Sequence, residues 1–270
     1  MRGILFLFFV CLLLVSCRKE TIIIDDNEPP LWTDVPTLKI ENYLNRMYID
    51  LLGRQPLDYE RTEGVNKLRE TDLSYETRRQ IVEQLQTSET QIPNDSSYKY
   101  VYHERLYTHA KMRVLEGAPN SLFNQLIGNL NFGILVDSLN GEIAAMEAKK
   151  IRRDRLQNVL NSQLDHMNGD IGLNTMFARM IYNSVYDEIH MNTFNFVNAT
   201  FDNLLWRFPT QAEFDAGFAM VELNNPAILF GQTGYNKGDY VEIFEESIEM
   251  FEGLIIWAYQ SLLARPPTSI

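Results

Sequence analysis

The sequence predicts an all-α fold, an array or bundle of roughly eight to ten helices with repeated helix-corner-helix units. Helix-forming residues such as Leu, Glu, Arg, Met and Gln are plentiful, whereas the 270 residues include only 14 Gly and 10 Pro. Apolar residues recur at helical spacing, and runs that alternate between apolar and polar residues are nearly absent. A short motif that ends a helix also occurs three times.

Residues 1–16 predict a secretory signal peptide rather than a membrane span. Met1 and Arg2 lead into the apolar run 4–15, and the small residue Ser16 follows. A positive start, an apolar stretch of this length and a small residue before the cleavage point are typical of such signals. A membrane-spanning helix needs about 20 apolar residues.

The sequence Leu-Val-Ser-Cys at positions 14–17 resembles the lipobox of bacterial lipoproteins. The resemblance implies cleavage before Cys17, acylation of that residue by chains such as palmitate, and a lipid anchor that holds the protein outside the cytoplasm. It identifies Cys17 as the anchor residue.

Residues 17–36 are expected to form an extended acidic tether. The segment contains four acidic or amide residues in a row and then Pro29 and Pro30, with no amphipathic period. Such a tether resembles the surface-export signals of Bacteroidetes-type lipoproteins, with Lys19-Glu20 as a partial match. By the same analogy, Arg18 after the cysteine favours the outer membrane. Whether the protein faces the periplasm or the cell surface stays open.

The cysteine count and the net charge exclude several kinds of ligand and partner for the mature chain. Once Cys11 is removed with the signal and Cys17 is acylated, no thiol remains for a disulfide or a metal. A formal net charge of -12 argues against binding to nucleic acid or anionic headgroups. Residues 37–270 suffice for one helical domain or for two subdomains, about 37–167 and 168–270.

Periodicity and capping residues predict helices in the first half of this domain. Ile40, Leu44, Met47 and Leu51 form one apolar stripe, which predicts a helix over about residues 40–52. Ser74 has the position of an N-cap. Residues 98–115 form another helical segment, with Gly117 as its stop signal.

The second half contains further helical segments separated by turn signals. In chain order we expect a long helix with a basic polar face over 143–164, a turn at Asn168-Gly169, a helix from Leu173, a capping box of Thr210 with Glu213, a loop over 224–238, and a last helix over 240–263.

The repeated motif is aromatic-x-x-Leu-Leu-x-Arg-x-Pro. Its defining residues in the three copies are Tyr48, Leu51, Arg54 and Pro56; Phe201, Leu204, Arg207 and Pro209; and Tyr259, Leu262, Arg265 and Pro267.

The residue types in this motif predict a helix that ends and turns into another helix. The aromatic and the first Leu are three residues apart and share a buried face. The proline stops the helix, and the arginine in the last turn complements the free carbonyls. Glu60 and Glu213 then fall at the start of the next helix. We therefore interpret each copy as a structural corner rather than a binding or catalytic site.

The motif resembles the Leu-Gly-Arg-x-Pro corner of secreted helical modules that accompany planctomycete cytochromes. About 25 residues of each long copy carry the resemblance, and Trp206 stands where the first copy has Gly53. No Cys-x-x-Cys-His haem attachment site is present, so the resemblance implies no haem, and we expect no cofactor.

Several residue pairs resemble parts of metal-binding or catalytic motifs, but none has the spacing or the companion residues that the complete motif requires. His103 and His109 are six residues apart and do not share a helical face. Asp187-x-x-His190 lacks the second pair and the carboxylates of a di-iron site. The remaining candidates are incomplete motifs or surface features: His166, the glutamates 242–252, Ser96 with Lys99, the glycine-rich loop 231–238, and the Asx-rich segment 165–172.

Aromatic side chains are the remaining hint of a binding surface. Tyr98, Tyr100 and Tyr102 cannot all share one helical face, so we expect at least one to point outward. A second cluster lies at residues 194–208. An exposed aromatic on an exported protein suggests contact with a glycan or a protein.

The sequence therefore predicts a lipid-anchored helical accessory or binding protein of the outer membrane, without catalytic activity, that contacts a partner protein or glycan. One alternative is a hydrolase that acts on a cell-surface polymer through an Asp/Glu acid-base pair. Another is a structural subunit of an export or envelope complex.

Overall fold

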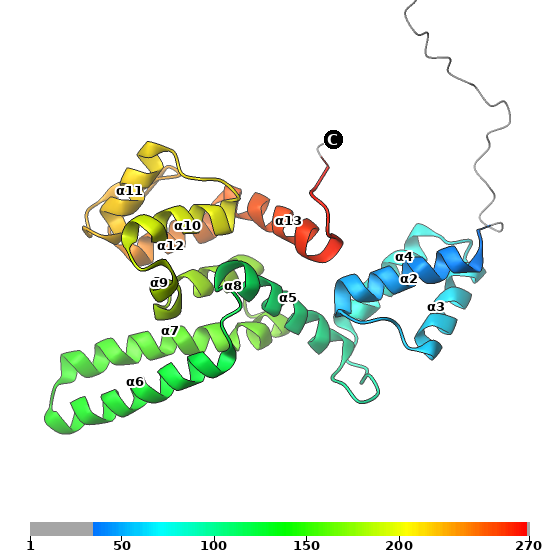
Figure 1. Ribbon diagram of the computed structural model, residues 1–270, viewed down its shortest axis with the longest axis horizontal. Coiled ribbons are helices and arrows are strands. Elements are labelled where there is room, and N and C mark those ends of the chain that lie inside the picture. Colours follow the sequence, from blue (N-terminus) through cyan, green and yellow to red (C-terminus); the bar gives the residue numbers. More distant parts are fainter. Residues whose placement is uncertain (1–34, 269–270) are drawn as a thin grey trace, which may run out of the picture. The chain divides into compact units, whose positions relative to one another are not determined.

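A computed structural model describes residues 35–268 of the chain (Figure 1). Cys17, the predicted signal peptide and nearly all of the predicted tether lie outside the described residues. Thr37–Ile270 forms a compact unit of its own. A division of this unit near residue 167 stays a prediction.

Residues 35–268 hold twelve α-helices and one small antiparallel hairpin, which confirms the all-α fold class. The elements are, in chain order, α2 (Thr37–Leu52), α3 (Asp58–Glu70), α4 (Tyr75–Thr87), α5 (Tyr98–Val114), α6 (Asn120–Asn140), α7 (Ile143–Asn168), α8 (Leu173–Ile181), α9 (Ser184–His190), α10 (Thr193–Leu205), α11 (Gln211–Val221), β1 (Ala227–Leu229), β2 (Gln232–Gly234), α12 (Lys237–Glu246) and α13 (Ile248–Leu263).

The helices α2, α3 and α4 pack against one another, and α5 continues from them toward α7 and α8. Ile40, Leu44 and Met47 are buried on one face of α2, as their spacing predicts. The Ser74 hydroxyl accepts a hydrogen bond from the backbone N–H of Thr77 and caps α4.

Helices α6 and α7 form a long hairpin (Figure 1), whose α7 arm packs against α5 and α8. The chain reverses at Gly141, whose φ of +75° suits glycine. Lys149 of α7 donates hydrogen bonds to both carboxylate oxygens of Asp137 on α6, at 2.6 and 2.7 Å. Of the residues of α6, only Phe123 and Asp137 are buried.

The main core lies among helices α5 and α7–α13. Large aromatic side chains fill it and meet edge to face, with ring centroids 5.2 Å apart for Phe177 and Trp257 and 4.9 Å for Phe201 and Phe244. Such pairs stabilise a core beyond their area of burial.

Two sequence predictions are wrong in the last third of the chain. The predicted loop 224–238 contains β1 and β2, whose strands of three residues are too short to show an alternating pattern. The predicted single helix 240–263 is two helices, because Ser247 is extended, ends α12, and caps α13 by accepting from the Met250 N–H. The break needs neither Gly nor Pro.

Candidate functional site

The first two copies of the repeated motif build the same corner. The Arg54 guanidinium donates to both oxygens of Glu60, at 2.8 and 2.7 Å. Arg207 donates to both oxygens of Glu213 in the same way, at 2.9 and 2.6 Å. Each glutamate also accepts from the backbone N–H three residues before it, at 2.6 and 2.7 Å. One carboxylate thus caps the new helix and holds the arginine of the old one.

The aromatic and the turn residue complete each corner. The guanidinium carbon lies 5.5 Å from the ring centroid of Tyr48 in the first copy and 5.1 Å from that of Phe201 in the second. The residue before the arginine is left-handed, with φ of +75° at Gly53 and +58° at Trp206. Trp206 is held in this conformation by its indole N–H, which donates to the Gly253 carbonyl at 3.1 Å.

The leucines are buried unequally in these corners. Leu204 and Leu205 are both buried in the second copy, whereas in the first copy Leu52 is buried and Leu51 is only partly buried. Helix α2 ends at Leu52 and α10 at Leu205, so each helix stops between the second leucine and the proline.

The third copy differs from the expectation of a buried corner. Tyr259 and Leu262 are only partly buried, and Leu263 is exposed. The arginine keeps the local geometry, since Arg265 lies 4.8 Å from the Tyr259 centroid and follows the left-handed Ala264. The difference is that within residues 35–268 no helix follows whose glutamate could accept from the guanidinium.

The corner glutamates Glu60, which is buried, and Glu213, which is partly buried, both have a lowered pKa. Burial raises the pKa of Glu60, but hydrogen bonds from Arg54 and Tyr98 outweigh burial and lower it. The Arg207 hydrogen bonds lower the pKa of Glu213 to about 2 against a smaller opposing effect of burial. These groups are ionised at neutral pH, which suits a structural ion pair.

The structure brings together two histidines that the sequence analysis did not pair. The Nδ1 atoms of His103 on α5 and His166 on α7 lie 2.8 Å apart. Burial, with added repulsion from His166 and Lys99, lowers the pKa of His103 to about 4, and burial lowers the pKa of His166. One neutral ring therefore donates to the other. A contact between residues 63 positions apart leaves no local signal in a sequence.

The other sequence candidates do not converge. Asp187 pairs with Lys237 of the glycine-rich loop, and Lys99 lies 3.8 Å from Glu89 rather than beside Ser96. The break at Ser247 separates the glutamates 242–252 into two groups. No group of three or more His, Cys, Asp or Glu residues within 35–268 is arranged to hold a metal ion.

The tyrosine prediction is wrong, since none of the three tyrosines expected to offer an outward ring is exposed. Tyr98 is buried, and Tyr100 and Tyr102 are half-buried. The Tyr98 hydroxyl donates to Glu60, and the Tyr102 hydroxyl accepts from Gln86 of α4 at 3.1 Å. In the second aromatic cluster, Phe194 and Phe208 are exposed.

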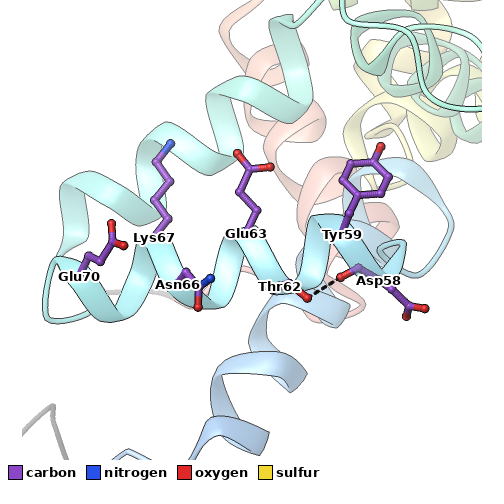
Figure 2. A pocket seen from close by; sticks show the side chains of 7 residues that line it. All are labelled: Asp58, Tyr59, Thr62, Glu63, Asn66, Lys67 and Glu70. Carbon is purple, nitrogen blue, oxygen red and sulfur yellow. Dashed lines mark hydrogen bonds between the residues drawn. The ribbon is translucent and has the colours of Figure 1, made fainter.

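A shallow polar groove runs along α3. Figure 2 shows its lining side chains, all from this one helix, with Tyr59, Glu63 and Lys67 pointing to the same side. The Tyr59 ring is 49% exposed. The seven lining residues are Asp58, Tyr59, Thr62, Glu63, Asn66, Lys67 and Glu70.

An exposed apolar surface lies on α6. Phe132 is 70% exposed, Leu135 56% and Leu139 79%. No charged residue occurs between Asn120 and Val136. These three apolar side chains recur at helical spacing on one exposed face, so the outer face of α6 has the character of an interface. We call Gly128, Phe132, Leu135 and Leu139 the α6 seam.

The sequence analysis missed this surface. The absence of charge in residues 120–136 was available as a signal, but only the structure shows that most of this helix stays uncovered. No helix within residues 35–268 combines the length and apolar character needed to cross a bilayer.

Comparison of the chain with models of protein families, with curated proteins and with solved structures finds no match.

Proposed function

We propose that this chain is a lipid-anchored accessory protein of the outer membrane, held by Cys17, that binds a partner protein through the α6 seam and does not act as an enzyme. The observation that carries the proposal is the exposure of Phe132, Leu135 and Leu139 on α6, a helix whose one charged residue, Asp137, is buried in an ion pair. Contiguous apolar surface of this kind is costly in water unless a partner covers it.

The hairpin is well suited to present this surface. The α6–α7 contact is the most extensive between any two elements of the described chain, and the Asp137–Lys149 ion pair fastens the helices near the tip. A rigid helical face loses little conformational freedom on binding.

The carboxyl groups do not favour the hydrolase alternative. An acid-base pair needs one carboxyl with a raised pKa. Among residues 35–268, the carboxyls with a displaced pKa are Glu60, Glu76 and Glu213, and the pKa of each is lowered. For all three, hydrogen bonds from an arginine contribute to this lowering.

Crosslinking in cells tests partner binding. A photoreactive amino acid at Phe132 of the full-length chain should give a discrete protein adduct after irradiation. The same amino acid at Asn129, which is exposed on α6 but lies about 100° away from Gly128 around the helix, is the matched control. Absence of any adduct at Phe132, or equal adducts at both positions, would contradict the proposal.

A second candidate function, glycan binding, is favoured by the α3 groove. An exposed ring on the same side of a helix as carboxylate and ammonium groups is a suitable surface for a sugar, and Tyr59, Glu63 and Lys67 form such a surface on α3. Tyr59→Ala should weaken retardation by an envelope polysaccharide in affinity electrophoresis. Tyr75→Ala removes a ring that is 72% exposed on α4 and should leave the retardation unchanged.

A further inference from the structure

We infer that the partner of the α6 seam is a second copy of this chain, and that two hairpins pair antiparallel about a two-fold axis between residues 133 and 134. This inference rests on the proposed function and names its partner. It follows from the order of residues along the seam, from their charge, and from one glycine.

The spacing of the α6 seam residues is the same in both chain directions. Gly128, Phe132, Leu135 and Leu139 are separated by 4, 3 and 4 residues, a spacing that keeps all four on one helical face. An antiparallel copy therefore places Phe132 against the partner's Leu135 and Gly128 against the partner's Leu139. A two-fold interface requires this reciprocal matching, in which residue i meets j and j meets i.

The antiparallel pairing explains why residue 128 is a glycine. Glycine inside an exposed helix destabilises it by about 1 kcal/mol relative to alanine. A Cβ at this position would meet no atom within 4 Å, so packing inside the described chain does not explain the glycine. In the antiparallel pair, the space beside Gly128 receives Leu139, the most exposed side chain of the seam.

The distribution of net charge allows two copies to pair at the hairpin, which is neutral, and opposes pairing through the rest of the chain, which is acidic. Residues 120–168 contain five acidic residues (Asp137, Glu142, Glu147, Asp154, Asp165) and five basic ones (Lys149, Lys150, Arg152, Arg153, Arg155), so they are formally neutral. The rest of the chain carries the entire net charge of -12. Two copies therefore repel each other except at their hairpins, and the charge of α6 nearest the symmetry axis, that of Asp137, is buried and paired with Lys149.

The area suffices for a specific dimer of modest affinity. Phe132, Leu135, Val136, Leu139 and Ile143 expose 37–79% of their surfaces, which is roughly 500 Å² of apolar area per copy. The flanking amides Asn124, Gln125 and Asn131 are exposed and extend this face. The apolar area alone gives about 1,000 Å² for two copies, the lower limit for a specific interface.

Disulfide trapping tests the register directly. Positions 128 and 139 are about 16 Å apart on one helix, whereas a disulfide needs Cα atoms within about 7 Å. The double variant Gly128→Cys/Leu139→Cys therefore forms a disulfide only between copies. Under mild oxidation, the purified full-length protein should give a covalent dimer on a non-reducing gel.

Three controls define the result. The single variants should not link, because each position faces the other one across the axis. Asn129→Cys/Asn140→Cys has the same separation but lies off the seam and should not link. The parent chain gives the background from Cys11 and Cys17. Equal linking by a single variant or by the off-seam pair would overturn the proposed register.

Sedimentation velocity of the full-length chain in detergent tests the dimer without cysteines. Leu135→Glu brings two carboxylates beside the axis and should weaken the dimer about tenfold or more. Asn129→Glu adds the same charge off the seam and should not. A parent chain that stays monomeric overturns the inference. If Phe132 then still crosslinks to a different protein in cells, the proposed function stands, and if it crosslinks to nothing, both fail.

Discussion

At the scale of single residues, the three corner arginines occupy three different surroundings in one chain. Arg54 holds a carboxylate, that of Glu60, whose side chain is only 2% exposed. Arg207 binds Glu213 and Glu249 at a more open site. The Arg265 guanidinium donates to the Pro266 carbonyl and lies over the Tyr259 ring, and it forms no ion pair among residues 35–268. Comparing the three arginines therefore separates the contribution of burial to stability from the contribution of the motif itself.

We expect alanine substitution to destabilise these sites in that order. Arg54→Ala leaves Glu60 buried without its counter-ion and should cost about 3–5 kcal/mol. Arg207→Ala should cost about 1–3 kcal/mol, because water reaches both partners. Arg265→Ala should change stability by less than about 0.5 kcal/mol. Urea unfolding followed by circular dichroism measures all three, and equal losses would refute the interpretation.

His103 makes the stability depend on pH. The unfolded side chain binds a proton below about pH 6.5, whereas the folded one does so only below about pH 4. Between these values the unfolded state binds more protons, so the contribution is complete above pH 6.5 and is lost as the pH falls toward 4. The Tm of the His103→Gln variant should therefore decrease less than the Tm of the parent chain when the pH is lowered from 7 to 5. Identical losses would exclude the histidine pair as a cause.

At the scale of elements, the crossing of α10 and α13 depends on Gly253. A Cβ at Gly253 would lie 1.8 Å from the backbone carbonyl oxygen of Leu204. The backbone cannot give way as a side chain can, so Gly253→Ala should separate the two helices and cost about 1–3 kcal/mol or more.

Gly64→Ala is the matched control for this contact. It also replaces a helical glycine, but the new Cβ would meet a terminal methyl carbon of Leu44 at 2.9 Å, and that side chain can shift. The two variants gain the same helix propensity. Thermal melts should show a large loss only for Gly253→Ala, and equal losses would contradict a backbone contact.

Local chemistry explains which elements were predictable. The capping box of Thr210 and Glu213 and the stop near Gly117 depend on neighbouring residues, and both occur in the structure. The bidentate pairing of Arg54 with Glu60 is also local, since six residues separate them. The helix ends and the position of each glutamate at the start of the next helix follow from local sequence, whereas the pairing of each arginine with its glutamate was not predicted.

The remaining features depend on contacts that a sequence does not display. The spacing of Tyr259 and Leu262 equals that of the buried copies, yet they are only partly buried because no following helix covers them within the described residues. Helix α6 gives no amphipathic period because apolar side chains lie on its exposed face as well as on its covered face. The His103–His166 contact joins two distant helices.

At the scale of the whole molecule, Cys17 is expected to determine where the protein resides. Cys17→Ala should remove the acylation site and release the protein from membranes, since lipid chains rather than a spanning helix are expected to hold it. Carbonate washing of membrane fractions measures this release. A Cys17→Ala chain that remains in the washed membranes would contradict the anchor.

Limited proteolysis should divide the chain at the boundary between its two parts. Thr37–Ile270 is compact, whereas residues 17–36 have the composition of a linker. We expect the first cut before Thr37, with a stable fragment that begins near Val35, identified by N-terminal sequencing. A first cut inside the helices would contradict this division.

The corner also has a consequence for recognising distant relatives of this chain. An aromatic residue stands six positions before the arginine, a proline two after it, and a glutamate six after it, in both buried copies. These intervals are set by one helical turn, one left-handed residue and the first turn of the next helix, so they do not depend on loop length elsewhere. A search for this spacing alone would detect helical proteins that share the corner after all other similarity has been lost.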